Sequence, residues 1–161
     1  MIFKKKSLPD EVTLEDIITH KNIHFITTKN ITDTISTLLN FSNSEEITSL
    51  NTMAILEKLK TREQLISTGL GQGIAIPHVG IENIQNFSIQ IGILRNEINW
   101  HAFDRKPVRI VILILFPIRK RNNYLRIIGK LSRILMQDTI RTALITSQNE
   151  ELAVTLLSNS S

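Results

Sequence analysis

The residues with the clearest potential for chemistry lie between positions 62 and 78. This segment reads Arg-Glu-Gln-Leu-Ile-Ser-Thr-Gly-Leu-Gly-Gln-Gly-Ile-Ala-Ile-Pro-His, ends on His78 and holds three of the chain's six glycines. A glycine-rich loop exposes backbone N–H groups without side-chain obstruction and can therefore bind an anion. It is not a Walker A loop, because no Gly-Lys-Ser/Thr follows, and not a Rossmann fingerprint, because it precedes its strand and opens no helix.

His78 has the properties of a nucleophile for phosphoryl transfer. A neutral imidazole can attack a phosphoryl group if one ring nitrogen keeps the proton while the other attacks, and a hydrogen bond to a backbone carbonyl would fix that tautomer. The fixed φ of Pro77 limits where the ring can point. Arg62 and Thr68 could supply the positive charge and the donor that a transferring phosphoryl group needs. A lone histidine at a strand end is more often a capped or solvated residue, so the prediction depends on the whole segment.

Helices are expected on both sides of this segment, from the spacing of apolar residues and from two capping boxes of the form Ser-x-x-Glu. They cover residues 12–18, 31–39, 42–60 (opened by Ser42 and Glu45), 123–135, and 147–157 (opened by Ser147 and Glu150). The buried face of the helix over 123–135 is predicted to hold Leu125, Ile128, Leu131 and Leu135.

Three strands are expected, over residues 74–77, 87–94 and 108–116. The last is a near-continuous run of mostly β-branched residues, which is typical of a strand buried on both faces. A sheet buried on both faces needs helices on both sides, so the fold class is predicted to be α/β, a three-layer α/β/α sandwich with a mixed central sheet. At 161 residues, the chain is expected to form one domain over 1–161.

The amino-acid composition excludes several classes of function. The absence of cysteine excludes disulfides, thiolate metal sites and cysteine nucleophiles. The longest apolar run, Ile110–Phe116, is far shorter than the ~20 residues of a membrane span, and the N-terminus lacks a secretory pattern, so we expect a cytoplasmic protein without membrane insertion. The net charge of +4 comes without the aromatic interleaving or recognition helix of nucleic-acid binders. No metal or cofactor is expected: His20 and His24 are four residues apart, but the segment between them reads as a loop.

Two stretches carry a resemblance to a known family. Thr68-Gly-Leu-Gly-Gln-Gly-Ile-Ala-Ile-Pro-His78 resembles the S/T-G-I-G-x-G-[IV]-A-[IL]-P-H motif of the fructose–mannitol type EIIA domains of the bacterial phosphotransferase system, a class that includes the nitrogen-regulatory EIIA proteins. The upstream Arg62-Glu63 matches the family's Arg-Glu. Residues 98–108, Ile-Asn-Trp-His-Ala-Phe-Asp-Arg-Lys-Pro-Val, resemble the family's I-x-W/F-D-A-x-D-G-x-P-V. The resemblance extends from about Val12 to Leu157.

The resemblance implies a phosphoryl carrier rather than a stand-alone enzyme. His78 would accept phosphate on Nε2, forming a phosphohistidine, and Arg62 beside it would neutralise the phosphoryl charge. The backbone of the loop from Gly71 to Gly73 would shape the pocket. The donor would be phosphorylated HPr or its nitrogen-branch counterpart. The acceptor would be an EIIB domain, or the phosphorylation state would regulate a target protein.

The chain departs from the family pattern at several positions. Tyr124 stands where a second active-site histidine is expected; a phenol can donate one hydrogen bond to a phosphoryl oxygen but cannot gain a positive charge. It could equally serve only to pack the helix. His101 and Arg105 replace the usual Asp and Gly of the downstream motif, and His101 is expected to be a surface or cap residue. The basic run 119–121 could help to hold the phosphate, or could repel a basic donor.

Three roles follow from this pattern. The main prediction is a regulatory EIIA that is phosphorylated on His78. The first alternative is a degenerate EIIA-like module that binds protein partners without efficient phosphoryl transfer, as the missing second histidine suggests. The second is a sugar-specific EIIA subunit that feeds a membrane permease.

Overall fold

The structure, a computed structural model, describes residues 18–159, so the predicted helix over 12–18 lies almost entirely outside the described residues. Six strands in this range form one sheet: β1 (Ile23–Ile26), β2 (Gly69–Gly71), β3 (Ile74–Ala75), β4 (His78–Ile81), β5 (Ser88–Ile98) and β6 (Val108–Pro117). The strand order is β1-β5-β6-β3-β2, and β4 also pairs with β6. The β5–β6 and β2–β3 pairs are antiparallel and the others parallel, so the sheet is mixed, as predicted.

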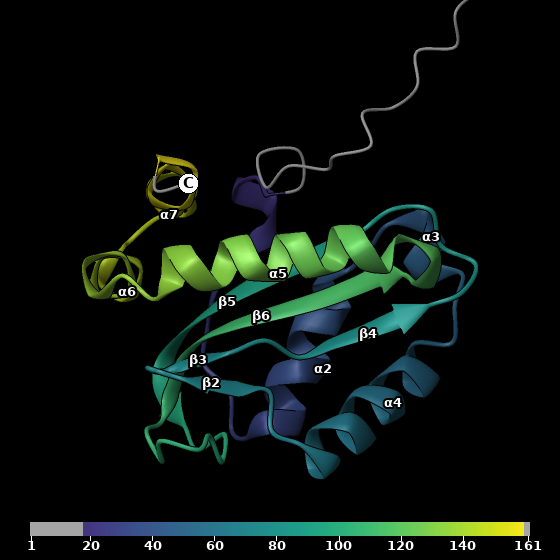
Figure 1. The fold of residues 1–161 in the computed structure, drawn as a ribbon, viewed down its shortest axis with the longest axis horizontal. Helices are drawn as coiled ribbons and strands as arrows, with labels where there is room; N and C mark the ends of the chain where they lie inside the picture. Colours follow the sequence, from purple (N-terminus) through teal and green to yellow (C-terminus); the bar gives the residue numbers. More distant parts are fainter. Residues whose placement is uncertain (1–17, 160–161) are drawn as a thin grey trace, which may run out of the picture.

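Helices cover both faces of this sheet (Figure 1). On one face lie α2 (Ile31–Phe41), α3 (Glu45–Thr48) and α4 (Thr52–Leu65); on the other lie α5 (Arg121–Leu135), α6 (Asp138–Thr146) and α7 (Glu150–Asn159). Two short 3-10 turns, η1 (His20–Asn22) and η2 (Ile118–Lys120), precede β1 and α5. The predicted three-layer sandwich is therefore confirmed. Within residues 18–159, no helix combines the length and the hydropathy that crossing a bilayer would require.

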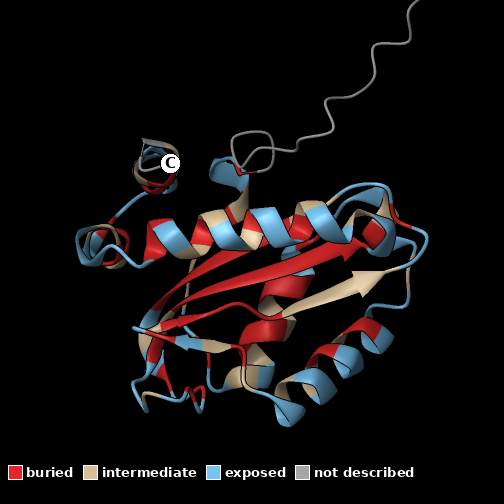
Figure 2. Cartoon of the chain, in the orientation of Figure 1, coloured by how far each residue is buried: buried red, intermediate tan, exposed pale blue. Residues whose placement is uncertain are grey.

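Strand β6 explains why the molecule has two cores. Its side chains alternate between the faces: Ile110, Ile112 and Ile114 join the cluster under α5, while Val111 and Leu113 join the cluster under α2 and α4. Figure 2 shows β5 and β6 as a buried band between the helical layers. The β-branched run thus forms a strand buried on both faces, as the sequence predicted.

The predicted helix over 42–60 is divided in the structure, and its predicted cap is wrong. Ser42 is the C-cap of α2, and Ser44 instead caps the short α3. Asn51 then starts α4, because its side chain accepts a hydrogen bond from the backbone N–H of Ala54 at 3.1 Å. Asparagine is among the preferred N-cap residues, so a cap inside the predicted helix starts a new one.

The C-terminal helices also differ from expectation. The predicted buried face of α5 is only partly right: Leu131 and Leu135 are buried as predicted, but Tyr124 and Ile127 are buried in the first half of the helix, where Leu125 is 51% exposed. The predicted cap at Ser147 is wrong, because Asn149 accepts the hydrogen bond from the N–H of Leu152 at 2.8 Å. Helix α6 was not predicted as a separate element. Because Tyr124 lies on the buried face of α5, its ring is next to that of His78 on β4.

Strand β4 was also not predicted, and it positions the site. It runs parallel to β6 with His78 opposite Ile114, and it pairs with no other described strand. All four of its residues are half-buried, so they give no alternating pattern. At this edge α4 from one face and the start of α5 from the other approach the same strand.

Candidate functional site

A hollow of about 660 Å³ lies over β4 at this edge. Three elements supply most of its walls, with the end of β6 below. The lining residues are Glu57, Lys58, Thr61, Arg62 and Leu65 of α4, His78, Val79 and Gly80 of β4, Phe116 of β6, and Arg121, Tyr124 and Leu125 of α5. Of the predicted site residues, the structure brings His78, Arg62 and Tyr124 together here.

The tautomer of His78 follows from one contact. Its Nδ1 lies 2.8 Å from the carbonyl oxygen of Ile76. A carbonyl oxygen only accepts, so Nδ1 must carry the proton and, in the neutral ring, Nε2 keeps its lone pair. The Ile76 and Pro77 backbones are themselves fixed, because the N–H of Ile76 donates to Thr68 at 3.1 Å and the carbonyl of Pro77 accepts from Ile114 at 3.0 Å. The imidazole is therefore held in the form that a nucleophile requires.

The surroundings of His78 keep it neutral. Burial lowers the pKa of His78 below its ordinary value of 6.5, the hydrogen bond to Ile76 raises it, and the charges of Arg62 and Arg121 lower it further while Glu63 raises it. The net direction is downward. The neutral ring, with its one proton on Nδ1, is therefore the favoured form at neutral pH.

Tyr124 lies beside this ring. The two ring centroids are 5.3 Å apart with a tilt of 33°, and Tyr124 stacks on Phe116 at 4.1 Å. Burial raises the pKa of Tyr124 above 10.0, against smaller opposing effects of Arg62 and Arg121. The residue therefore stays a neutral phenol that can donate one hydrogen bond.

The structure places Thr68 outside this hollow, which corrects its predicted role as a phosphate donor. Glu63 accepts hydrogen bonds from the backbone N–H of Thr68 at 2.7 Å and from its hydroxyl at 2.6 Å. The indole N–H of Trp100 donates to the same hydroxyl at 3.3 Å. With its hydroxyl proton used and only 7% of its surface exposed, Thr68 ties the end of α4 to the sheet.

The glycine turn also lies apart from His78, so the predicted phosphate cradle is corrected as well. Gly71 and Gly73 have φ values of 86° and 79° on either side of Gln72, and neither lines the hollow. The anion that this turn binds is the chain's own carboxylate: the N–H of Gln72 donates to Asp104 Oδ2 at 2.8 Å. Hydrogen bonds from the backbones of Gln72 and Lys106 lower the pKa of Asp104 accordingly. The glycines shape a turn that anchors the β5–β6 loop.

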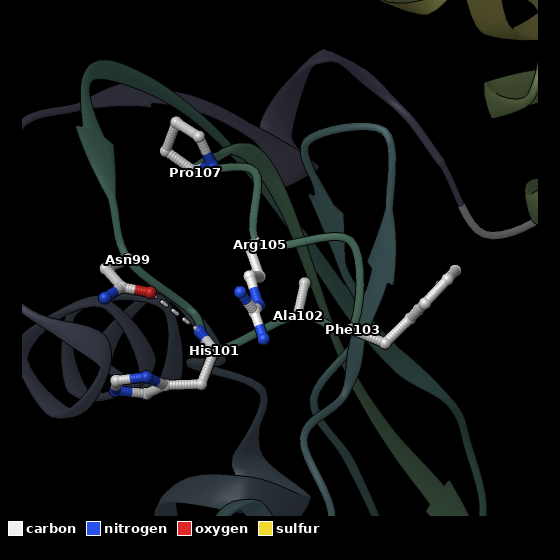
Figure 3. A pocket seen from close by; sticks show the side chains of 6 residues that line it. All are labelled: Asn99, His101, Ala102, Phe103, Arg105 and Pro107. Carbon is white, nitrogen blue, oxygen red and sulfur yellow. Dashed lines mark hydrogen bonds between the residues drawn. The ribbon is translucent and has the colours of Figure 1, made fainter.

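That loop forms a second hollow of about 600 Å³ (Figure 3). Asn99, His101, Ala102, Phe103, Arg105 and Pro107 line it. Phe103 points away from the other side chains and is 85% exposed. His101 and Arg105, the two departures from the family motif, have φ values of 55° and 58°. His101 is exposed, as expected. Among residues 18–159 no set of three His, Cys, Asp or Glu side chains is arranged to bind a metal.

Comparison with known proteins identifies the chain's family. Residues 16–160 match the family described as "Phosphoenolpyruvate-dependent sugar phosphotransferase system, EIIA 2". The chain belongs to this family. The predicted resemblance is thereby confirmed, and the fold described above is an EIIA fold.

Relatives of this EIIA chain include sugar-specific and regulatory proteins. It is 30% identical over 104 residues to the fructose-specific EIIABC component of Bacillus subtilis; the match covers 65% of the chain but only 16% of that much longer protein. It is 27% identical to the nitrogen regulatory protein of Klebsiella oxytoca, over 94% of the chain and 91% of the relative. The crystal structure of nitrogen regulatory protein IIA-Ntr from Neisseria meningitidis superposes with a TM-score of 0.81 at 27% identity, covering 88% of the chain and 97% of that structure.

Sequence reasoning missed part of the EIIA pocket. Lys58 and Leu65 line it but lie outside any motif. The only available signal was their spacing, about one helical turn before and one after Arg62. Glu63 was noted only as half of a motif, and its pairing with Thr68 depends on how the chain turns after α4. Arg121 was seen only as one member of a basic run.

Proposed function

We propose that this EIIA chain is a phosphoryl carrier of a phosphoenolpyruvate-dependent phosphotransferase system, and that His78 accepts the phosphate on Nε2. The observation that carries the proposal is the 2.8 Å hydrogen bond between His78 Nδ1 and Ile76 O, since it leaves Nε2 as the free nucleophile. Arg62 in the same pocket supplies positive charge for the transferring group.

The step is a direct transfer between two imidazoles. The lone pair of His78 Nε2 forms a bond to the phosphorus of a phosphohistidine on the donor, phosphorylated HPr or a nitrogen-branch HPr-like protein. The P–N bond of the donor breaks, and its electron pair returns to the donor nitrogen. His78 keeps its Nδ1 proton, and Ile76 O stabilises the positive charge that then develops on the ring. Onward transfer reverses these roles toward an EIIB domain.

A mainly regulatory role is supported by the extent of the matches. The Klebsiella nitrogen regulatory protein is matched over 91% of its length and the Neisseria IIA-Ntr structure over 97%, whereas the chain spans only 16% of the Bacillus fructose component. We therefore propose a cytoplasmic regulatory EIIA whose phosphorylation state acts on a target protein. A sugar-specific subunit feeding a permease is the alternative role for the same chemistry.

A degenerate module that binds partners without efficient transfer is a second candidate. Tyr124 in place of the usual histidine favours it, because a neutral phenol supplies no charge to the phosphoryl group. A fast single-turnover transfer from the donor would exclude this candidate. Slow transfer with intact partner binding would favour it.

Intact-mass measurement tests the proposal directly. The chain is incubated with phosphoenolpyruvate, Enzyme I and HPr, and we expect the mass of one added phosphoryl group. The gain should vanish in His78→Ala and persist in the matched variant His101→Ala, whose histidine lies in the β5–β6 loop. A gain that survives in His78→Ala would overturn the assignment of the acceptor.

A further inference from the structure

The three residues of the basic run Arg119-Lys120-Arg121 do not share the same surroundings in the structure. The guanidinium of Arg119 donates to the side-chain carbonyl of Gln85, and Lys120 Nζ donates to the backbone carbonyl of Gln85 at 2.8 Å. Both side chains thus bind the loop that follows β4. Only Arg121 among the three lines the His78 hollow. Three adjacent cations that look equivalent in the sequence therefore have two different surroundings.

The charge of Arg121 acts on both polar rings of the site. It lowers the pKa of His78 and the pKa of Tyr124, as Arg62 does from the opposite wall. Two guanidinium groups, one from α4 and one from α5, therefore flank the nucleophile. Lys58 adds a third cation to the lining, against the single carboxylate of Glu57.

The position of Arg121 is unfavourable for its own helix. It is the first residue of α5, where the helix dipole favours negative charge, and the first turn holds no acidic residue. The N-cap, Lys120, makes no side-chain capping hydrogen bond. An arginine here does not help α5 to form, but it places a permanent cation and the positive end of a 15-residue helix at one wall of the pocket.

We propose that Arg121 binds the phosphoryl group carried by His78, and that Arg121 and Tyr124 together take the place of the family's second histidine. A protonated imidazole would supply both a hydrogen bond and a positive charge. Here Tyr124 donates the hydrogen bond and Arg121 supplies the charge, through a guanidinium whose planar donors suit phosphate oxygens. This inference rests on the proposed function, and it makes Arg121 a catalytic residue for the transfer.

Inorganic phosphate provides a test that needs no phosphoryl donor. Phosphate is titrated into the wild-type chain while the ring signals of His78 and Tyr124 are followed by NMR. We expect Arg121→Gln to weaken the apparent affinity about tenfold or more, since a charge-assisted hydrogen bond is lost. Arg121→Lys should recover part of the loss, and the matched variant Arg119→Gln should stay within about twofold of wild type.

The transfer rate provides the second test. Single-turnover phosphorylation by phosphorylated HPr should slow about tenfold or more in Arg121→Gln, and not in Arg119→Gln. Adding Tyr124→His to Arg121→Gln should restore much of the rate, because the imidazole returns the missing charge. Arg121→Gln should need no less urea to unfold than wild type, since removing a cation from the start of α5 favours the helix.

The two tests separate the failure of this inference from the failure of the proposed function. If wild type gains no phosphoryl group yet binds phosphate through Arg121, the carrier function is wrong and the anion site stands. If Arg121→Gln binds phosphate as tightly as wild type, or if Arg119→Gln loses as much affinity, Arg121 has no special role. The same conclusion follows if Arg121→Gln is phosphorylated at the wild-type rate.

Discussion

Glu63 accepts two hydrogen bonds from Thr68, one from its backbone N–H at 2.7 Å and one from its hydroxyl at 2.6 Å. Glu63 lies in the last turn of α4, next to Arg62, and Thr68 precedes the first residue of β2. The pair therefore fixes the connection between α4 and the sheet. Because Arg62 is the neighbour of Glu63 in this turn, the pair also helps to hold Arg62 at the wall of the hollow that His78 lines.

Replacing Glu63 tests this positioning role. Glu63→Gln leaves one carbonyl oxygen where two carboxylate oxygens accept, so one donor of Thr68 loses its partner. We expect the free energy of unfolding to fall by about 1–3 kcal/mol, measured by urea denaturation, and phosphorylation of His78 to slow. The matched variant Glu57→Gln changes an exposed residue on the same helix, and its stability should stay within about 0.5 kcal/mol of wild type. An equal loss of stability in both variants would contradict a special role for Glu63.

The lowered pKa of His78 gives a defined pH dependence. Its NMR titration midpoint should fall below 6.5, chiefly because the ring is buried. The unfolded chain then binds a proton at higher pH than the folded chain, so stability declines as pH falls through about 6.5 toward the folded-state pKa. Urea denaturation of wild type and of His78→Gln, which cannot titrate, should show a smaller decline for the variant over this range. A titration midpoint at or above 6.5 would show that burial does not dominate the pKa of His78.

Two substitutions of Tyr124 should distinguish its role as a hydrogen-bond donor from its role in packing. Tyr124→Phe removes the hydroxyl but keeps the ring that stacks on Phe116, so stability should change by less than about 1.5 kcal/mol. Phosphoryl acceptance in single turnover should slow about threefold to tenfold, because one donor to the phosphoryl oxygens is lost. Tyr124→Ala should instead destabilise by about 3–5 kcal/mol, like other large-to-small core changes. An unchanged transfer rate in Tyr124→Phe would mean that the tyrosine serves packing alone.

Arg105 should be replaceable by glycine with a gain in stability. At a φ of 58° an L side chain is strained by about 1–2 kcal/mol, which glycine avoids at a smaller cost in chain entropy. We expect Arg105→Gly to raise the free energy of unfolding by about 0.5–1 kcal/mol, measured in urea, and to leave phosphorylation of His78 unchanged. Lys106→Gly, one residue further on and without a positive φ, should lower stability by a similar amount. A loss of stability in Arg105→Gly would show that the arginine side chain makes a compensating contact.

The local sequence determined much of this protein. Apolar spacing placed α2, and the β-branched run 108–116 placed the strand that both cores share, because these patterns depend only on residues close in the chain. The segment ending on His78 predicted the phosphoryl acceptor, whereas the tautomer of its ring was assigned only by the contact between Nδ1 and Ile76 O. The resemblance to the EIIA motif also predicted that Tyr124 stands where the family has its second histidine.

Only the tertiary structure decided how these residues are used. Thr68 and the glycine turn looked like phosphate ligands, but the donors of Thr68 bind Glu63, and the N–H of Gln72 in the turn binds Asp104, 32 residues away. Likewise, Arg119 and Arg121 became distinct only when β4 and its following loop were placed beside the start of α5. Contacts between segments far apart in the chain determine which hydrogen-bond donors remain available to a phosphate. Local residue patterns do not predict those contacts.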